Sequence, residues 1–370
     1  MDVAKAASSA LRSAKMIRYG VFGFLIILIA TVAAWAYNKS TLQKSNCDAM
    51  NTLYADFAKV HTVNTANEAY SHNLRDYYVK TAYNACSAGQ FKNDFVDTCA
   101  LKNCLRQGVR CLDFEVYSVD NKPVIATSSV DDYSVKETYN SVAFADALAV
   151  INDYAFSGGT SPNPGDPIIL HLRIMSKNAP IYKMMADELE TAFPTRLLGP
   201  KFSYENQGKN LGQVPLKDLM GKVVIIADKS EGIFESTELD EYVNIASNSV
   251  FMRALRYSDG VKYTPDMSEL TEFNKKCMSI CLPDLSADDT NPSASLAMKC
   301  GCQMVAMCTQ NFDANMEYYD MFFDEAGTAF VLKPAELRYI PVTIPAPTPP
   351  PESYSYKDRS VSADYYSFTI

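Results

Sequence analysis

The sequence has little histidine and no excess of basic residues, and both shortages exclude classes of protein. Only three of its 370 residues are histidine, against ten cysteines. Lys and Arg number 34 and Asp and Glu 43, a formal net charge of −9. A protein that follows nucleic-acid phosphates needs clustered Lys and Arg, so we expect no nucleic-acid partner. The same acidity argues against simple electrostatic docking on anionic lipid.

The overall composition is that of a globular protein. Apolar residues make up 48% and charged residues 21%, which excludes disorder, collagen and plain coiled coil for the bulk of the chain. The length allows two or three domains, or one α/β barrel of about 250 residues with additions.

The chain has one long apolar run, near its N-terminus. Residues 19–38 contain no charged side chain. At about 1.5 Å per residue they span the roughly 30 Å hydrocarbon core of a bilayer. Tyr19, Trp35 and Tyr37 flank the run as aromatic residues flank membrane helices. We interpret 19–38 as a transmembrane signal-anchor helix, followed by a membrane-proximal linker at 39–60.

A cleaved signal peptide is the alternative, because Ala34-Trp35-Ala36 resembles a cleavage site. The run exceeds the usual apolar core of a signal peptide, which favours a retained anchor. Basic residues are more numerous before the run than just after it: Lys5, Arg12, Lys15 and Arg18 against Lys39 and Lys44. This bias predicts a single-pass protein with residues 1–18 in the cytoplasm and the rest outside, on a lumenal, extracellular or virion side.

The cysteines form two groups of five: Cys47, Cys86, Cys99, Cys104 and Cys111, then Cys277, Cys281, Cys300, Cys302 and Cys308. Outside the cytoplasm such a set predicts disulfides. Zinc is the alternative, but the spacings match no standard zinc module and no histidine lies nearby. Because five is odd, either one bridge joins the groups or each group leaves a thiol unpaired.

Residues 61–340 alternate short apolar runs with amphipathic helical stretches. Residues 167–172 and 222–227 are typical of buried strands, and Phe144, Leu148, Ile151 and Ala155 recur at helical spacing. The pattern predicts an α/β fold, a single TIM-type (β/α)8 barrel.

The segment after the barrel differs in composition. Residues 341–351 are rich in proline, which predicts an extended arm, and residues 352–370 are rich in Tyr and Ser. This 341–370 tail is either flexible or a binding segment for protein partners.

Polar residues in the first half suggest a site for a hard cation. Asp113 and Glu115 are two apart on an expected strand, so their side chains share a face. With Ser71-His72-Asn73 they would supply two carboxylates and an amide oxygen, ligands that suit calcium. For the two acids alone, a solvated or salt-bridged strand end is the alternative.

The order of these motifs resembles that of the phosphoinositide-specific phospholipase C family, a TIM-barrel phosphodiesterase family. The similar segments are Ser71-His72-Asn73 and residues 108–115, 219–225, 301–306 and 331–338. The resemblance implies an X-like half at 61–198 and a Y-like half at 215–340. It also implies that His72 is catalytic, that Asn73, Asp113 and Glu115 are calcium ligands, and that Arg256 binds the substrate phosphate.

The sequence departs from the family at the expected site. Thr127 stands at the position of the second catalytic histidine, and a threonine cannot act as a general acid near neutral pH. Arg173 stands where a glutamate would be the fourth metal ligand. Ile226 and Asp228 stand where two lysines would bind the substrate phosphate.

The change at Arg173 weighs most, because a guanidinium cannot ligate a cation and remains charged. We predict that Arg173 pairs with Asp113 and Glu115 in an internal ion-pair cluster. We expect no cofactor, and calcium only if the vestigial site still binds it. His171, on the same face one layer deeper, is interpreted as a hydrogen-bonded core residue, with a displaced catalytic histidine as the alternative.

These departures favour a membrane-anchored, catalytically degenerate phospholipase C-like protein with a binding or assembly role. The alternative is an active, calcium-independent phosphodiesterase acting on phosphatidylinositol-type lipids, since an arginine takes the metal's place in some bacterial relatives of the fold. A structural envelope protein with a partner-binding tail is a third hypothesis.

The resemblance also bears on the cysteines. Cys111 and Cys302 coincide with cysteines of the resembling enzymes, which leaves four cysteines per group to pair internally.

Overall fold

The computed structural model describes the chain except residues 1, 132–134, 231–232, 342–346, 352–353 and 355, and the side chains of 2–14. Contacts divide it into two compact units, Met1–Tyr339 and Ile340–Ile370. The first unit contains the barrel and the N-terminal helix. The second contains the tail.

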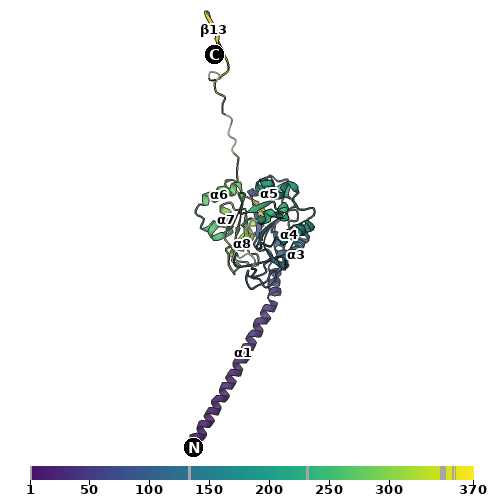
Figure 1. Ribbon diagram of the computed structural model, residues 1–370, viewed down its shortest axis with the longest axis vertical. Coiled ribbons are helices and arrows are strands. Elements are labelled where there is room, and N and C mark those ends of the chain that lie inside the picture. The colour runs from purple at the N-terminus through teal and green to yellow at the C-terminus, as the bar shows by residue number, and fades with distance from the viewer. Residues whose placement is uncertain (1, 132–134, 231–232, 342–346, 352–353, 355) are drawn as a thin grey trace. The chain divides into compact units, whose positions relative to one another are not determined.

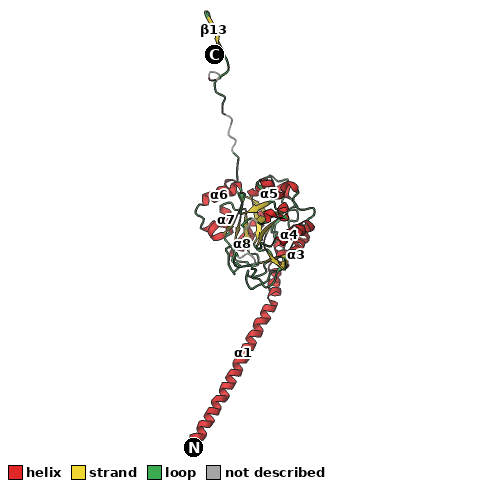
Figure 2. Ribbon diagram, viewed as in Figure 1, coloured by secondary structure: helices red, strands yellow, loops and turns green. Residues whose placement is uncertain are grey.

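Eight parallel strands form a nearly closed barrel, seen in yellow at the centre of Figure 2. They are β1 (Tyr77–Ala82), β2 (Cys111–Val119), β5 (Ile168–Ile174), β6 (Val223–Asp228), β7 (Ile245–Ser247), β8 (Met252–Arg256), β9 (Met278–Leu282) and β10 (Met304–Met307). Their order is β7-β6-β5-β2-β1-β10-β9-β8, so β7 and β8 are the two end strands. The expected TIM-type fold is confirmed.

The register of the strands decides which side chains meet at the barrel mouth, the carboxyl end of the strands. In the β2–β5 pair, Asp113 lies opposite His171 and Glu115 opposite Arg173. The alternation of a strand then directs all four side chains to one face. Three short strands are added outside the parallel set: β3 (Lys122–Ala126) pairs with β2, β4 (Val142–Ala143) with β3, and β11 (Phe330–Leu332) with β1.

Helices cover the barrel, with α3 beside α4 in Figure 1. They are α2 (Thr98–Arg106), α3 (Phe144–Ala155), α4 (Ala179–Ala192), α5 (Ser203–Gly208), α6 (Met267–Lys276), α7 (Ala294–Lys299) and α8 (Ala314–Ala326). In α5, residues 204–207 have left-handed backbone angles. The stripe Phe144, Leu148, Ile151 and Ala155 is buried on α3, as its spacing predicts. Apolar faces of this kind pack on the strands and build the core.

Helix α1 runs without interruption from Asp2 to Leu53. It therefore includes most of the stretch 39–60 that we expected to be a linker. Residues 15–53 contain a window of mean hydropathy 2.1, and the residues of that window are not buried against the protein. By length and composition this helix could cross a membrane, a criterion that a signal sequence also meets.

The second unit ends in a β-hairpin that sequence patterns did not predict. Strand β12 (Ser360–Ala363) pairs antiparallel with β13 (Tyr366–Thr369). Tyr366 and Phe368 stack on one face of the hairpin, with ring centroids 5.6 Å apart. The expected extended arm at 341–351 lies partly outside the described residues, and 347–351 have no regular secondary structure.

The cysteines form one disulfide, Cys47–Cys99, which joins α1 to α2. The other eight are free thiols, so the expectation of four internal pairs is wrong. Seven of these thiols are buried and pack as small apolar side chains in the core: Cys86, Cys104, Cys111, Cys281, Cys300, Cys302 and Cys308. Cys111 and Cys302 are unpaired, as the resemblance implied.

Candidate functional site at the barrel mouth

Arg173 lies at the centre of a hydrogen-bonded cluster at the carboxyl ends of β1, β2 and β5. Its Nε and one terminal nitrogen donate to the two carboxylate oxygens of Asp113, at 2.9 and 2.7 Å. The other terminal nitrogen donates to Glu115 Oε1 at 2.9 Å. Asn84, two residues beyond β1, accepts a fourth bond on its amide oxygen at 2.9 Å. The predicted ion pairs of Arg173 with Asp113 and Glu115 are confirmed.

The remaining acceptor of the cluster is also satisfied. Glu115 Oε2 accepts hydrogen bonds from the Tyr117 hydroxyl at 2.8 Å and from the Ser128 backbone amide at 3.0 Å. The Tyr83 ring covers the guanidinium of Arg173, with 4.8 Å between the ring centroid and the guanidinium carbon. The cluster is buried: Asp113 and Glu115 are at most 1% exposed and Arg173 is 5% exposed.

This pairing stabilises the charged forms in spite of burial. Desolvation would raise the pKa of Asp113, but Arg173 and His171 lower it well below its ordinary range. Desolvation would lower the pKa of Arg173, but Asp113, Tyr83 and Glu115 raise it well above its usual value. Burial and the Glu115 carboxylate raise the pKa of Tyr117, whose hydroxyl stays protonated as a donor. At neutral pH the cluster therefore holds fixed opposite charges.

His171 extends the cluster inward, as expected of a hydrogen-bonded core residue. Its Nδ1 lies 2.6 Å from Asp113 Oδ1 and its Nε2 lies 2.9 Å from Ser247 Oγ. The Ser247 hydroxyl donates to Asp228 Oδ2 at 2.8 Å. Because that hydroxyl gives its one hydrogen to Asp228, it accepts a hydrogen bond from His171 Nε2. His171 is fully buried, so both of its nitrogens are engaged away from solvent.

A polar cavity of about 180 Å³ opens above Arg173. Two arginines, Arg173 and Arg256, line it together with Asp131, Asp228 and Asn248. Arg256, at the end of β8, donates to the Tyr83 hydroxyl at 3.2 Å and pairs with Asp131 at 3.1 Å. The structure thus brings the predicted Arg256 to the same mouth as Arg173.

Two other predicted residues lie at the opposite end of the barrel. His72 and Asn73 precede β1, where Asn73 bridges to Pro215 and His72 Nε2 lies 3.2 Å from an Arg338 nitrogen. The six residues of β1 span about 20 Å at roughly 3.3 Å each. His72 and Asn73 are therefore not brought together with Asp113 and Glu115.

The residues that take those places after β1 are Tyr83 and Asn84, which the motif search missed. Asn84 donates from its side chain to Glu115 Oε1 at 3.1 Å, and its backbone amide contacts Asp113. The position of Asn84 in the sequence could have identified it. Functional side chains of a βα barrel follow the carboxyl ends of the strands, and Asn84 follows the buried strand β1, whereas the triplet Ser71-His72-Asn73 precedes it. Thr127 lies near this mouth, where its hydroxyl donates to the Phe91 carbonyl at 3.0 Å.

The donor set does not fit a calcium ion. Calcium needs six to eight oxygen ligands. Here both oxygens of Asp113, both of Glu115 and the Asn84 amide oxygen already accept hydrogen bonds from Arg173 or its neighbours. The positive charge that such a site would attract is already present on Arg173.

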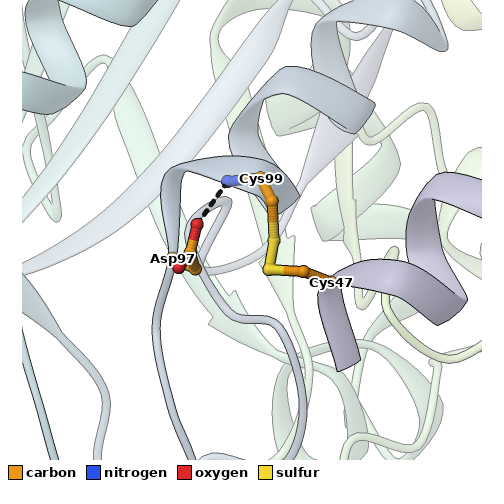
Figure 3. Close-up of side chains that lie close together, drawn as sticks. All are labelled: Cys47, Asp97 and Cys99. Carbon is orange, nitrogen blue, oxygen red and sulfur yellow. Dashed lines mark hydrogen bonds between the residues drawn. A yellow bond between two sulfur atoms is a disulfide. The ribbon is translucent and has the colours of Figure 1, made fainter. Parts of the chain in front are cut away.

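Cys47, Asp97 and Cys99 form a second group of ligand-type side chains, shown in Figure 3. The disulfide occupies both sulfur atoms, and Asp97 caps α2 by accepting from the Cys99 amide at 2.8 Å. A thiolate is the form that binds metal, so this group is a structural link and not a metal site.

Two family models match the chain in consecutive segments. The phosphatidylinositol-specific phospholipase C X domain matches residues 70–229, and the Y domain matches residues 232–336. The chain belongs to the phosphoinositide-specific phospholipase C-like family. The predicted recognition is confirmed. The division between the halves differs from the expected one, because residues 215–229, expected in the Y-like half, belong to the X match. A search of curated protein sequences gave no significant match.

Solved structures share the fold at low sequence identity. PLC21 from S. officinalis has a TM-score of 0.62 and 20% identity, over 76% of this chain and 39% of that one. PLC21 from L. pealei has a TM-score of 0.60 and 20% identity, over 73% and 38%. A calcium-dependent phospholipase C from Pseudomonas sp. has a TM-score of 0.44 and 11% identity, over 72% and 97%. The chain thus spans about two fifths of each PLC21.

Proposed function

We propose that this protein is a membrane-anchored, catalytically inactive phospholipase C-like barrel that binds a ligand or partner instead of cleaving lipid. The observation that carries the proposal is the Arg173 cluster, in which the guanidinium bonds both oxygens of Asp113, one of Glu115 and the Asn84 amide oxygen, and Tyr117 bonds the other oxygen of Glu115. A catalytic metal and this arginine cannot occupy the same place.

The positions of the histidines also support inactivity. General acid–base catalysis of phosphodiester cleavage needs a group that exchanges protons at the reacting oxygens. The chain has three histidines: His61 is exposed and near the amino ends of the strands, His72 contacts Arg338, and His171 is buried below Arg173. The mouth cavity has Tyr83 and Thr127 nearby instead.

The charges of the cavity support an anionic ligand. Arg173 and Arg256 both line it, and Asp131 now neutralises Arg256 from a surface loop. A phosphate-bearing headgroup could replace the Asp131 carboxylate on Arg256, since arginine binds both groups through the same paired donors. We therefore propose a lipid headgroup of the phosphoinositide type as the bound ligand.

The second candidate is an active, calcium-independent phosphodiesterase. It is favoured by one observation, that Arg173 lines the cavity and could supply positive charge in place of a metal. This candidate still lacks a general acid at the mouth cavity.

We also propose a location and partners for the protein. The barrel lies outside the cytoplasm, with α1 as the anchor and the 341–370 tail as a contact for protein partners.

The deciding experiment is a phosphodiesterase assay on the full chain in mixed micelles with phosphatidylinositol and its phosphates, with and without calcium. We expect the wild type to release no more inositol phosphate than an Arg173→Ala variant, which serves as the control. Release of inositol phosphate by the wild type that disappears in Arg173→Ala would favour the active candidate. His72→Ala should change nothing under either candidate, because His72 lies at the far end of the strands.

Binding is tested separately with a water-soluble inositol phosphate headgroup and the full chain in detergent, by titration calorimetry, because α1 would hold every variant on a vesicle. We expect Arg256→Gln to weaken headgroup binding and Asp131→Asn to strengthen it several-fold, because the second change releases Arg256 from its present partner. Arg253→Gln is the matched control, since Arg253 lies on β8 with Arg256 but pairs with Glu269 of α6. Equal headgroup binding by all variants would contradict a headgroup ligand at this site.

A further inference from the structure

The part of α1 beyond the apolar run packs along α2, and the two helices run in the same direction. Three contacts follow one another in the same order along both helices: Gln43 with Asp97, Cys47 with Cys99, and Asn51 with Asn103. Met50 and Tyr54 are buried at this contact, and an Arg106 nitrogen donates to the Tyr54 carbonyl. The last four turns of α1 are therefore docked on the barrel.

The direction of α2 relates α1 to the two ends of the barrel. In a βα barrel each helix begins near the mouth and returns to the amino ends of the strands. Asp97, the cap of α2, follows the loop that leaves the carboxyl end of β1, and α2 then leads to β2. Gln43 thus lies on the mouth side of α1 and Leu53 on the opposite side.

The residues after α1 agree with this direction. The His61 amide donates to the Gly327 carbonyl, at the end of α8, and the Val63 amide donates to Asp166, just before β5. Asp166 lies at the amino end of β5, and the neighbouring Gly165 amide donates to Thr62 Oγ1 at 3.1 Å. The chain has then crossed the barrel from mouth to base along its outer surface.

The docked stretch begins at the rim of the mouth. Lys39, the first residue after the apolar run, donates to the Asn93 carbonyl at 3.2 Å and lies 5.2 Å from the centroid of the Tyr139 ring. Asn93 and Tyr139 belong to the loops that follow β1 and β3, and these loops bond each other. The same rim exposes Val130, Val135 and Tyr139, each about half accessible.

We propose that α1 holds the barrel with its mouth facing the bilayer that α1 itself spans, so that the rim meets the headgroup layer. The helix is continuous, and the apolar run precedes the rim contact at Lys39, so the bilayer lies on the mouth side. Along the helix axis, the distance from residue 38, the last of the apolar run, to Gln43 is only about 8 Å at 1.5 Å per residue. Half-exposed apolar and aromatic side chains suit that interface. The inference rests on the proposed anchor and names the partner surface: lipid of the same membrane.

The test measures which end of the barrel is close to lipid. A fluorescent amino acid replaces Lys122, exposed at the mouth-side start of β3, or Lys217, exposed before β6 at the amino ends. The full chain is reconstituted into vesicles that carry acceptor-labelled headgroups. We expect energy transfer from position 122 to exceed that from 217 by about threefold or more, because strands of six residues already separate the two ends by about 20 Å.

Carbonate extraction of the same vesicles tests the anchor independently. Retention of the chain together with the expected difference in transfer supports the inference. If the chain is retained but energy transfer is equal from the two positions, or greater from position 217, the proposed orientation is wrong and the anchor is still supported. Release of the chain overturns the anchor and the orientation with it.

Discussion

The charge on Arg173 decides which ions the barrel mouth can hold. The cost of burying this guanidinium is offset because Asp113 takes two of its hydrogen bonds and Glu115 and Asn84 take one each. The resemblance identified the substitution as the departure that matters most. The geometry adds the reason, which is that this one side chain bonds Asp113, Glu115 and Asn84 together.

Reversing this charge should create a calcium site. In Arg173→Glu, three carboxylates and the Asn84 amide would converge without a cation, and their repulsion favours calcium. We expect titration calorimetry to detect one calcium per chain in this variant and none in the wild type. Arg253→Glu, which changes the net charge equally at an exposed pair, is the control. Stoichiometric calcium binding by the wild type would contradict our account.

Lys333 should make the stability of the protein depend on pH. It is 1% exposed and donates to the Asn274 and Gly301 carbonyls, and desolvation lowers its pKa to about 7. The unfolded chain keeps this proton up to about pH 10.4. Between these values the unfolded state binds more protons, so the free energy of unfolding rises with pH, by at most about 1.4 kcal/mol per unit from this group.

The contribution of Lys333 is isolated by comparison of variants. Denaturant unfolding of the full chain in detergent at pH 6 to 9 should give a flatter profile for Lys333→Met than for the wild type. Lys217→Met, at an exposed position, should leave the profile unchanged. A wild-type profile retained in Lys333→Met would show that the lysine is not responsible.

At the scale of elements, the Cys47–Cys99 disulfide links a helix that could cross a membrane to the first helix of the barrel. Other contacts between α1 and α2 are side-chain hydrogen bonds and a small apolar cluster. The disulfide adds a covalent link to these contacts. The free thiols, by contrast, belong to the core.

Removing this disulfide should destabilise the protein. It closes a loop with a sequence separation of 52, for which the chain-entropy model gives about 4 kcal/mol. We expect Cys99→Ala to lower the unfolding temperature under oxidising conditions and to abolish the effect of a reductant. Cys277→Ala, at a half-exposed free thiol, should behave like the wild type. A reductant effect that persists in Cys99→Ala would indicate another bridge.

At the scale of the whole molecule, the barrel and the tail are separate compact units. The tail hairpin exposes Tyr365, Tyr366 and Phe368, side chains that suit contact with a partner. The two strands of the hairpin pair with each other over four residues each.

Deleting 341–370 should therefore leave the barrel intact. We expect its unfolding temperature to change little, because the buried core clusters of the barrel are built from residues before 340 in the described part of the chain. Thermal unfolding of the deletion variant checks this. A large loss of stability would show that the tail is part of the barrel fold, and an unchanged barrel with impaired assembly would agree with a partner-binding tail.

Local sequence patterns were sufficient for much of the fold. A continuous apolar run such as 167–172 identifies a strand buried on both faces, and the recurrence at Phe144, Leu148 and Ile151 identifies a helix packed on it. The order of such segments, with motifs at fixed places, was enough to recognise the barrel and to single out Arg173. These inferences depend only on neighbours in sequence or on resemblance.

Tertiary structure alone decided which residues share the mouth. It placed Asn84 and not Asn73 beside Asp113, paired Cys47 with Cys99 among ten cysteines, and docked α1 parallel to α2. Each of these depends on the register of elements far apart in the chain, which no local pattern encodes. The scarcity of histidine was visible from the first count, but only the folded barrel shows that none of the three lines the mouth cavity.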